Sequence, residues 1–147
     1  MQEATLQKIS KVFMNDITLI ALPKILDERG NLSFLESDNH IPFQIKRTYL
    51  IYDVPGGEIR GGHAFKNQRE VIVALSGSLD VILHDGTEEK RITLNRSYNA
   101  LYIPAMMWRQ MENFSTNAVV LCVASTDFDE NDYIRFFDEY KNAVSNG

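Results

Sequence analysis

One imidazole stands out among the side chains that could do chemistry at neutral pH. His63 lies in the segment 57–77, which is rich in glycine and charged residues. An imidazole titrates near pH ~6.5, so it can accept a proton and later return it. Residues two apart on a strand face the same side, so His63 and Phe65 are predicted to point together into the fold. Glu70 would join them from the next strand, either as a catalytic group or as the partner of a nearby cation.

Several cations near this segment are candidates for binding an anionic ligand. The chain carries 15 Lys and Arg against 20 Asp and Glu, a formal charge of −5. Such a balance disfavours nucleic acid as a partner, so an anionic ligand would need a local cluster of positive charge. A guanidinium suits phosphate oxygens because it binds them through two parallel hydrogen bonds. The candidates are Arg47, Arg60, Lys66 and Arg109, and for each the alternative is a solvated surface charge.

The elements that must position these residues are short strands, each followed by a turn. Residues 45–52 alternate well, and Arg47 and Tyr49 share one strand face that we expect to point inward. Asp85-Gly86 is a strong hairpin signal, because glycine accepts the positive φ of a tight turn. Eight or nine such strands predict a sandwich or a small barrel. The expected strands cover 17–26, 32–36, 45–52, 71–75, 79–84, 91–94, 100–103 and 118–124.

Only the C-terminal part of the chain is predicted to be helical. Acidic residues fill the first turn of the segment 127–144, and an aromatic stripe follows at helical spacing. The expected fold is therefore all-β with one C-terminal α-helix. At roughly 100–200 residues per domain, the 147 residues form one domain, with residues 1–16 as an N-terminal extension. The stripe consists of Tyr133, Phe136, Phe137 and Tyr140.

Composition excludes several classes of protein. Hydrophobic residues make up 44% of the chain and charged residues 24%, as in an ordinary globular domain. The single cysteine, Cys122, excludes an intrachain disulfide and a cysteine-cluster zinc site. The apolar runs are far shorter than the ~20 residues that span a bilayer, and residues 1–16 lack the continuous apolar segment of a signal peptide. We therefore expect a cytoplasmic protein.

The segment 57–77 resembles the first cupin motif, G-x5-H-x-H-x3,4-E-x6-G, and residues 104–113 resemble the second, P-x-G-x-x-H-x3-N. The resemblance implies a cupin double-stranded β-helix, which is a jelly-roll barrel. Metal-binding cupins use three histidines and one glutamate, and Phe65 and Arg109 occupy two of those four positions here. A guanidinium has no lone pair to donate to a metal. His63 and Glu70 alone are too few ligands for a retained ion, so we predict no metal.

Longer stretches are similar to the WxcM-like cupins, the bacterial sugar 3,4-ketoisomerases that act on thymidine diphosphate (dTDP)-linked 4-keto-6-deoxyglucose. The resemblance implies a homodimer with exchanged N-terminal strands, no cofactor, and a nucleotide-linked keto sugar in the barrel, for the synthesis of surface-polysaccharide sugars. It makes His63 a catalytic acid/base and places Arg29 in a turn close to the sugar. Phe65 and Arg109 stand where family members have histidines. The matching segments are 45–49, 60–66, 85–86, 104–108 and 129–135.

The implied reaction moves a ketone from C4 to C3 of the sugar. It requires removal of the C3 proton, an enediol(ate) intermediate and reprotonation at C4, all without a redox cofactor. His63 is the candidate base, and Tyr49 is a candidate hydrogen-bond partner or proton relay. Phe65 either fills the core or forms a platform for the sugar or base. The substrate-binding candidates are Arg29, Arg47, Arg60, Phe65, Lys66, Glu70 and Arg109.

Three other functions fit parts of the same pattern. A non-catalytic cupin could keep the nucleotide-sugar pocket and lack the chemistry. A 3- or 5-epimerase abstracts a proton from the same class of substrate but returns it differently. A metal-dependent cupin dioxygenase is the least favoured alternative. The sequence leaves open the choice of thymidine or uridine and the configuration of the product at C4.

Overall fold

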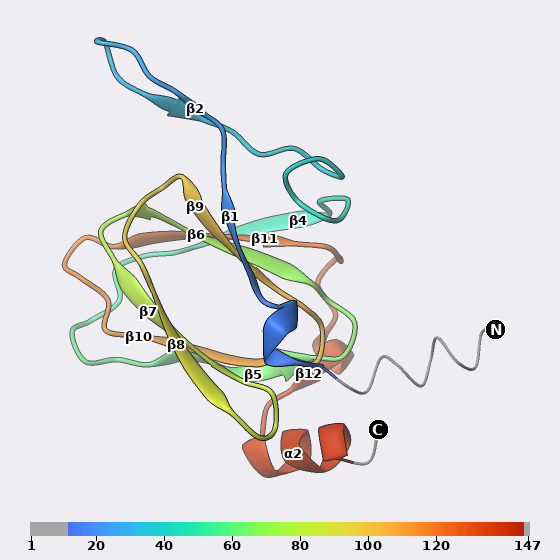
Figure 1. Cartoon of the computed structure of the whole chain (residues 1–147). Helices are drawn as coiled ribbons and strands as arrows, with labels where there is room; N and C mark the ends of the chain where they lie inside the picture. Colours follow the sequence, from blue (N-terminus) through green and yellow to red (C-terminus); the bar gives the residue numbers. More distant parts are fainter. Residues whose placement is uncertain (1–11, 146–147) are drawn as a thin grey trace.

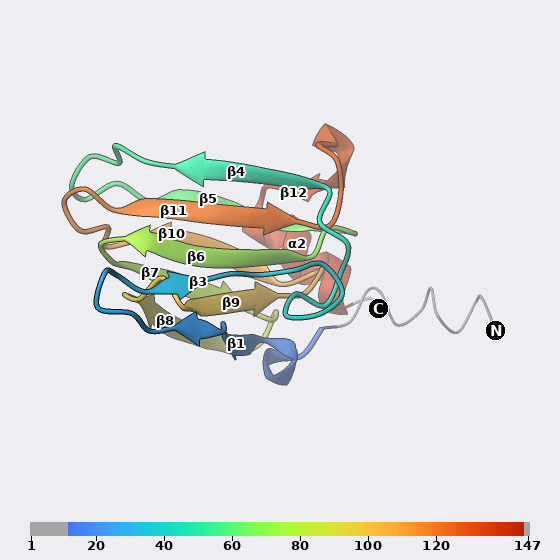
Figure 2. The ribbon, with the colours of Figure 1, turned by 90° about the horizontal axis from the view of Figure 1, so that it is seen from above.

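The computed structural model describes residues 12–145 and contains two five-stranded antiparallel sheets that face each other (Figure 1). Viewed from above, the first sheet lies in front of the second (Figure 2). The strand order of the first sheet is β1 (Thr18–Ala21), β9 (Asn99–Ile103), β6 (Glu70–Ser76), β11 (Val119–Ala124) and β4 (Arg47–Ile51). That of the second is β12 (Tyr133–Ile134), β5 (Arg60–Phe65), β10 (Trp108–Glu112), β7 (Leu79–His84) and β8 (Glu89–Leu94). The predicted all-β class is confirmed.

An apolar core fills the space between the two sheets. Cys122 on β11 lies between Tyr49 on β4 and Ile72 on β6, and all three contribute to this core. Leu83 and Met111 enter it from the second sheet. Because side chains alternate along a strand, this register turns Tyr49 toward the interior, as we expected from residues 45–52.

The loop between β6 and β7 shows why a glycine stands at position 77. Gly77 has a φ of +70°, and a Cβ added there would lie 2.4 Å from Ser115 Oγ and 2.9 Å from Ala118 Cα. The neighbouring loop carrying Ser115 is held close by its hydroxyl, which accepts a hydrogen bond from the Ser78 amide at 2.8 Å. This glycine therefore permits both the turn and the contact between the two loops.

The only α-helix in residues 12–145 is α2 (Phe137–Ser145), which begins ten residues later than the helix predicted over 127–144. The preceding residues form the 3-10 turn η2 (Glu130–Asp132) and strand β12. The buried Asp132 carboxylate accepts hydrogen bonds from the amides of Asn67 and Gln68, at 2.8 and 3.0 Å, which ties this segment to the loop after β5. A helix over this segment would lose these two hydrogen bonds, which explains why the helix begins later than predicted. α2 packs on the outer face of the second sheet through Tyr140, whose hydroxyl donates to the backbone carbonyls of His84 and Met106.

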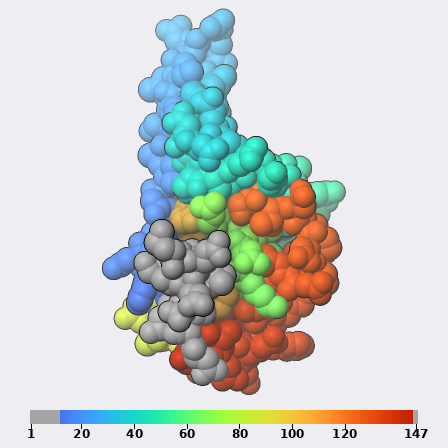
Figure 3. All heavy atoms as spheres, turned by 90° about the vertical axis from the view of Figure 1, so that its right-hand side faces the viewer, coloured from blue at the N-terminus to red at the C-terminus, as the bar shows by residue number. Residues whose placement is uncertain are grey.

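Near the N-terminus the chain forms an arm that projects from the barrel (Figures 1 and 3). Within residues 12–145 the short strands β2 (Lys24–Ile25) and β3 (Leu32–Ser33) pair only with each other. The strand expected over 17–26 is interrupted at Pro23, which has no N–H to continue the ladder. Of the predicted N-terminal extension, residues 1–11 lie outside the described residues, and Met14–Asp16 form the 3-10 turn η1. No helix within residues 12–145 is long and apolar enough to cross a membrane.

Candidate active site

A cavity of about 280 Å³ opens beside His63 and is lined by residues of both sheets. His63 and Arg60 come from β5, and Tyr49 comes from β4 in the opposite sheet. Tyr133 and Arg135 enter from β12 and the residue that follows it. The rest of the lining is apolar or glycine. The cavity therefore combines an imidazole, two phenols and two guanidinium groups around a small space.

His63 is held in this cavity by aromatic neighbours. Its ring packs edge-on against Phe65 and Tyr133, with centroids 4.8 and 5.1 Å away. Its Nε2 atom is buried and has no hydrogen-bond partner in residues 12–145. Burial, followed by the positive charges of Arg109 and Arg135, lowers the pKa of His63 to about 3. The imidazole is thus neutral at pH 7, which is the form that a general base requires.

Glu70 and Arg109 form an ion pair that crosses the interior from one sheet to the other. Arg109 Nη1 lies 2.5 Å from Glu70 Oε2, and both side chains are about 1% exposed. The other Glu70 oxygen accepts a hydrogen bond from the Tyr49 hydroxyl. The predicted substrate-binding residues Glu70 and Arg109 are therefore buried behind Tyr49 and do not line the cavity.

Phe65 fills the core. It is 1% exposed, its ring centroid lies 4.6 Å from that of Tyr133, and the Arg109 guanidinium lies 5.0 Å from it. Of the two alternatives left open by the sequence, the structure favours the core filler over the ligand platform. With Phe65 and Arg109 in place of histidines, residues 12–145 contain no group of three His, Cys, Asp or Glu side chains that could hold a metal ion.

The remaining predicted cations lie in different places. Arg60 lines the cavity. Arg47 is half-buried on the same strand face as Tyr49 and donates to Gln68 Oε1 at 3.1 Å and to the Thr126 carbonyl at 3.4 Å. Lys66 is exposed just after β5, outside the cavity lining.

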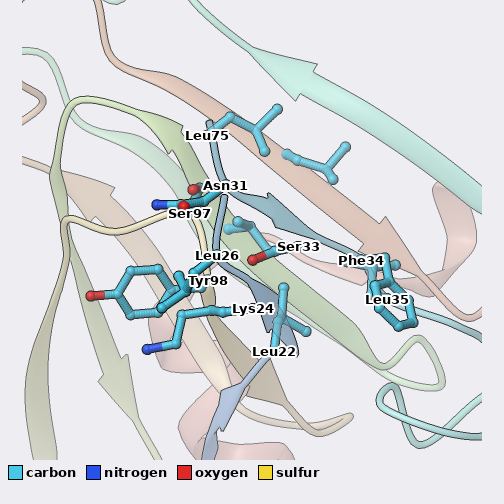
Figure 4. Close-up of a pocket in the computed structure, with 12 residues that line it drawn as sticks. Leu22, Lys24, Leu26, Asn31, Ser33, Phe34, Leu35, Leu75, Ser97 and Tyr98 are labelled. Carbon is cyan, nitrogen blue, oxygen red and sulfur yellow. The ribbon is translucent and has the colours of Figure 1, made fainter. Parts of the chain in front are cut away.

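Arg29 lies at the tip of the arm and does not join His63 in this chain. Its guanidinium pairs with the Asp27 carboxylate at 2.8 Å, and the pair is exposed. A larger groove of about 690 Å³ lies at the base of the arm, where Leu22, Lys24, Leu75 and Tyr98 surround it (Figure 4). The groove has no imidazole and does not include any of the cavity residues around His63.

Tyr133 and Arg135 are cavity residues that the sequence did not single out as site residues. The Arg135 guanidinium stacks over the Tyr133 ring at 4.0 Å, and it also donates to Glu130 Oε1 at 2.9 Å. The sequence places Tyr133 in the aromatic stripe of the predicted helix, whereas the structure pairs it with Phe65 on β5. The match of 129–135 to the WxcM-like proteins was the one signal that pointed to this segment.

Two facing antiparallel sheets with a histidine in their interior define a small cupin barrel. The chain belongs to the WxcM-like family: the family model described as "FdtA: WxcM-like, C-terminal" matches residues 15–145. It is 42% identical over 127 residues to a TDP-4-oxo-6-deoxy-alpha-D-glucose-3,4-oxoisomerase of Aneurinibacillus thermoaerophilus, covering 86% of this chain and 91% of that protein.

Two solved structures are similar over most of their length. A 3,4-ketoisomerase from Helicobacter canadensis is 42% identical with a TM-score of 0.86, and the match covers 88% of this chain and 98% of that one. A variant of the 3,4-ketoisomerase QdtA from Thermoanaerobacterium thermosaccharolyticum, solved with TDP-4-keto-6-deoxyglucose, is 36% identical with a TM-score of 0.88. That match covers 91% of this chain and 97% of that one.

Proposed function

We propose that this protein interconverts the 4-keto and 3-keto forms of a TDP-linked 6-deoxyhexose. The Aneurinibacillus relative is named for this reaction, and the QdtA variant was solved with the corresponding keto sugar. Within this chain, the observation that carries the proposal is the buried Nε2 atom of His63, which has no partner in residues 12–145 and belongs to a cavity-lining side chain. An unpartnered buried donor or acceptor is costly, and a bound substrate would supply the missing contact.

In the proposed reaction His63 moves one proton between two adjacent carbons. The neutral imidazole removes the proton from C3, and the electrons of that C–H bond form the C3–C4 double bond of an enediolate with its charge on O4. The hydroxyl proton on O3 passes to O4 as C3 becomes the carbonyl, and the imidazolium returns its proton to C4. No electrons leave the sugar, so no redox cofactor takes part. Proton transfer by a positioned group typically contributes ~10²–10⁴-fold to the rate.

The cavity cations fit the diphosphate of such a substrate. A volume of about 280 Å³ is just below the ~300–1,000 Å³ of sites for drug-sized ligands, which suits the sugar ring and leaves the nucleotide at the rim. Arg60 and Arg135 line this cavity, and we assign them to the diphosphate oxygens. The chemistry that we propose needs no metal ion, in keeping with Phe65 and Arg109 at the cupin ligand positions.

We further propose that the protein is a homodimer in which the arms are exchanged. The arm carries exposed apolar side chains, among them Leu26 at 73% exposure, and monomers rarely expose large contiguous apolar patches. The groove at its base offers an apolar surface of the first sheet (Figure 4). Exchange would carry Arg29 of one copy to the barrel of its partner, which reconciles its place at the arm tip with its predicted role near the sugar.

Incubation with TDP-4-keto-6-deoxyglucose in heavy water, followed by NMR, tests the proposed reaction. We expect the 3-keto isomer to form, with deuterium at C4 wherever the imidazolium exchanges its proton with solvent before returning it, and we expect both product and exchange to be lost in His63→Asn. Binding of TDP without any exchange would identify a non-catalytic binding protein. Exchange at C3 or C5 with an inverted 4-keto product would identify an epimerase instead.

A further inference from the structure

The buried ion pair between Glu70 and Arg109 has no clear reason to exist as a stabilising element. Both charges are removed from water, and the remaining Arg109 donors, Nε and Nη2, are met by the Met107 carbonyl at 3.2 and 3.1 Å. Burying two charges is costly, and replacing such a pair by hydrophobic residues is often neutral or stabilising. Stability alone therefore does not account for the pair, and its function is to be sought among the residues that it contacts.

Tyr49 is the neighbour that connects the ion pair to the cavity. Its hydroxyl donates to Glu70 Oε1, while Glu70 Oε2 accepts from Arg109. Tyr49 lines the cavity and the other two residues do not. The chain of contacts therefore runs from the Met107 backbone through Arg109 and Glu70 to a phenol at the cavity wall.

This arrangement fixes the direction of the only hydrogen on the Tyr49 oxygen. A phenol has one O–H donor and can also accept. Because its hydrogen points at a carboxylate that Arg109 holds in place, the Tyr49 oxygen can only accept a hydrogen bond from a ligand. Burial and the adjacent Glu70 carboxylate raise the pKa of Tyr49 well above its ordinary value, so the phenol stays protonated.

We propose that Glu70 and Arg109 are positioning residues, which hold the Tyr49 hydroxyl as an acceptor for a sugar hydroxyl during the isomerisation. The inference rests on the proposed function, in which the O3 hydroxyl must release its proton as C3 becomes a carbonyl. A phenol oxygen that accepts from O3–H fixes the orientation of that hydroxyl while His63, on the opposite sheet, removes the C3 proton. The hydrogen bond to Tyr49 is released when the O3 proton passes to O4. Glu70 and Arg109 act through Tyr49 and make no contact with the substrate.

A double-mutant cycle separates this role from direct binding and from simple stabilisation. The pair is neutralised together in Glu70→Gln/Arg109→Gln, so that neither charge is left buried alone, and the pair variant is combined with Tyr49→Phe. Since misplacement of a reacting group by about 1 Å can cost ~100-fold, we expect kcat to fall about 10- to 100-fold in the pair variant. We expect the KM of the pair variant and its affinity for TDP to stay within about twofold of the wild type. We expect the kcat of the triple variant to equal that of Tyr49→Phe within about twofold.

Two controls complete the kinetic test. Glu88→Gln removes an exposed carboxylate from the β7–β8 turn and should leave kcat unchanged. Thermal unfolding of each variant identifies any that is not folded, and Arg109→Met/Glu70→Leu then serves as an apolar replacement of the same pair. Loss of TDP affinity in the pair variant would mean direct contact with the ligand, and rate effects that add in the triple variant would mean independent action. Either result overturns the inference.

A spectroscopic measurement tests the geometry without turnover. A phenol proton held by a buried carboxylate should exchange slowly and give a proton resonance downfield of the amide region. We expect this resonance in the wild type and its loss in both Tyr49→Phe and the pair variant. An active enzyme without the resonance overturns the positioning role alone. A wild-type protein that shows the resonance but no isomerisation overturns the proposed function and, with it, the role assigned to the pair.

Discussion

The ring of Tyr133 packs edge-on against the ring of His63, with centroids 5.1 Å apart, although the two residues are separated by 70 positions in the chain. The contact depends on β12, whose pairing with β5 brings Tyr133 opposite Phe65. One face of the imidazole is thereby covered by an aromatic side chain, which contributes to the burial that keeps it neutral. A short strand near the C-terminus thus completes the surroundings of a histidine on a central strand.

The first prediction concerns stability at low pH. The pKa of His63 is about 3 in the folded protein and 6.5 for an ordinary histidine. Between these values the unfolded chain binds a proton that the folded chain does not, so the His63 contribution to stability falls as the pH drops. The loss should approach ~1.4 kcal/mol per pH unit. Urea unfolding of wild type and His63→Asn at pH 7 and pH 4.5 should show the wild type losing more stability; equal losses would contradict the burial of a neutral imidazole.

A second prediction concerns Arg135, which we assign to the diphosphate. Removing its guanidinium in Arg135→Met should weaken TDP binding by about 10- to 100-fold, the usual range for a hydrogen bond to a charged group. Calorimetric titration with TDP measures the effect. The exposed Arg96, which within residues 12–145 donates only to the Asn95 carbonyl, provides the matched control. Arg96→Met should bind TDP as the wild type does. Unchanged affinity in Arg135→Met would place the diphosphate elsewhere.

The interior histidine and most strands could be predicted from sequence because each leaves a local pattern. His63 sits in a motif with fixed spacing, and residues 45–52 alternate with period two. Strand β10 has no such pattern, since its inward position 109 is an arginine where an apolar residue would be expected. That arginine is compatible with the core only because Glu70, 39 positions away, neutralises it. A partner so distant leaves no local signal, so the sequence leaves open a cation as the partner of Glu70 but does not identify it as Arg109, which it predicts to bind the ligand.

The start of the predicted helix is wrong for a similar reason. Tyr133, Phe137 and Tyr140 are spaced as on one helix face, but only the last two lie in α2. Local periodicity did not reveal that the Asp132 carboxylate binds two backbone amides of the β5–β6 loop. Tertiary hydrogen bonds overrode the helical pattern, and they also carried Tyr133 and Arg135 into the cavity.

The third prediction concerns the glycine at the β6–β7 turn. Gly77→Ala would bring a Cβ to within 2.4 Å of Ser115 Oγ and 2.9 Å of the Ala118 backbone, at a φ of +70°. We expect a loss of about 1–3 kcal/mol in the free energy of unfolding, measured by urea denaturation. Gly56→Ala is the control, because a Cβ there meets nothing within 4 Å and should change stability by less than ~0.5 kcal/mol. Similar stabilities for the two variants would show that the turn can relax at little cost.

The last prediction concerns the arm. Leu26 and Leu32 are exposed on it at 73% and 54% in a single chain, and in an exchanged dimer they would be covered by the partner. A carboxylate at such a position is costly to bury without a partner charge. Leu32→Asp should therefore lower the molecular mass in solution from that of a dimer toward the 16.8 kDa of a single chain. Light scattering coupled to size-exclusion chromatography measures this.

Phe136→Asp is the matched control for the arm variant, because Phe136 is 72% exposed but lies beside α2. It should leave the oligomeric state unchanged, since neither the arm nor the groove at its base contains this residue. If the wild type runs as a monomer, or if Leu32→Asp stays dimeric while Phe136→Asp dissociates, the arm is not the dimer contact. Arg29 would then have no route to a sugar, because in one chain it sits at the arm tip and pairs with Asp27.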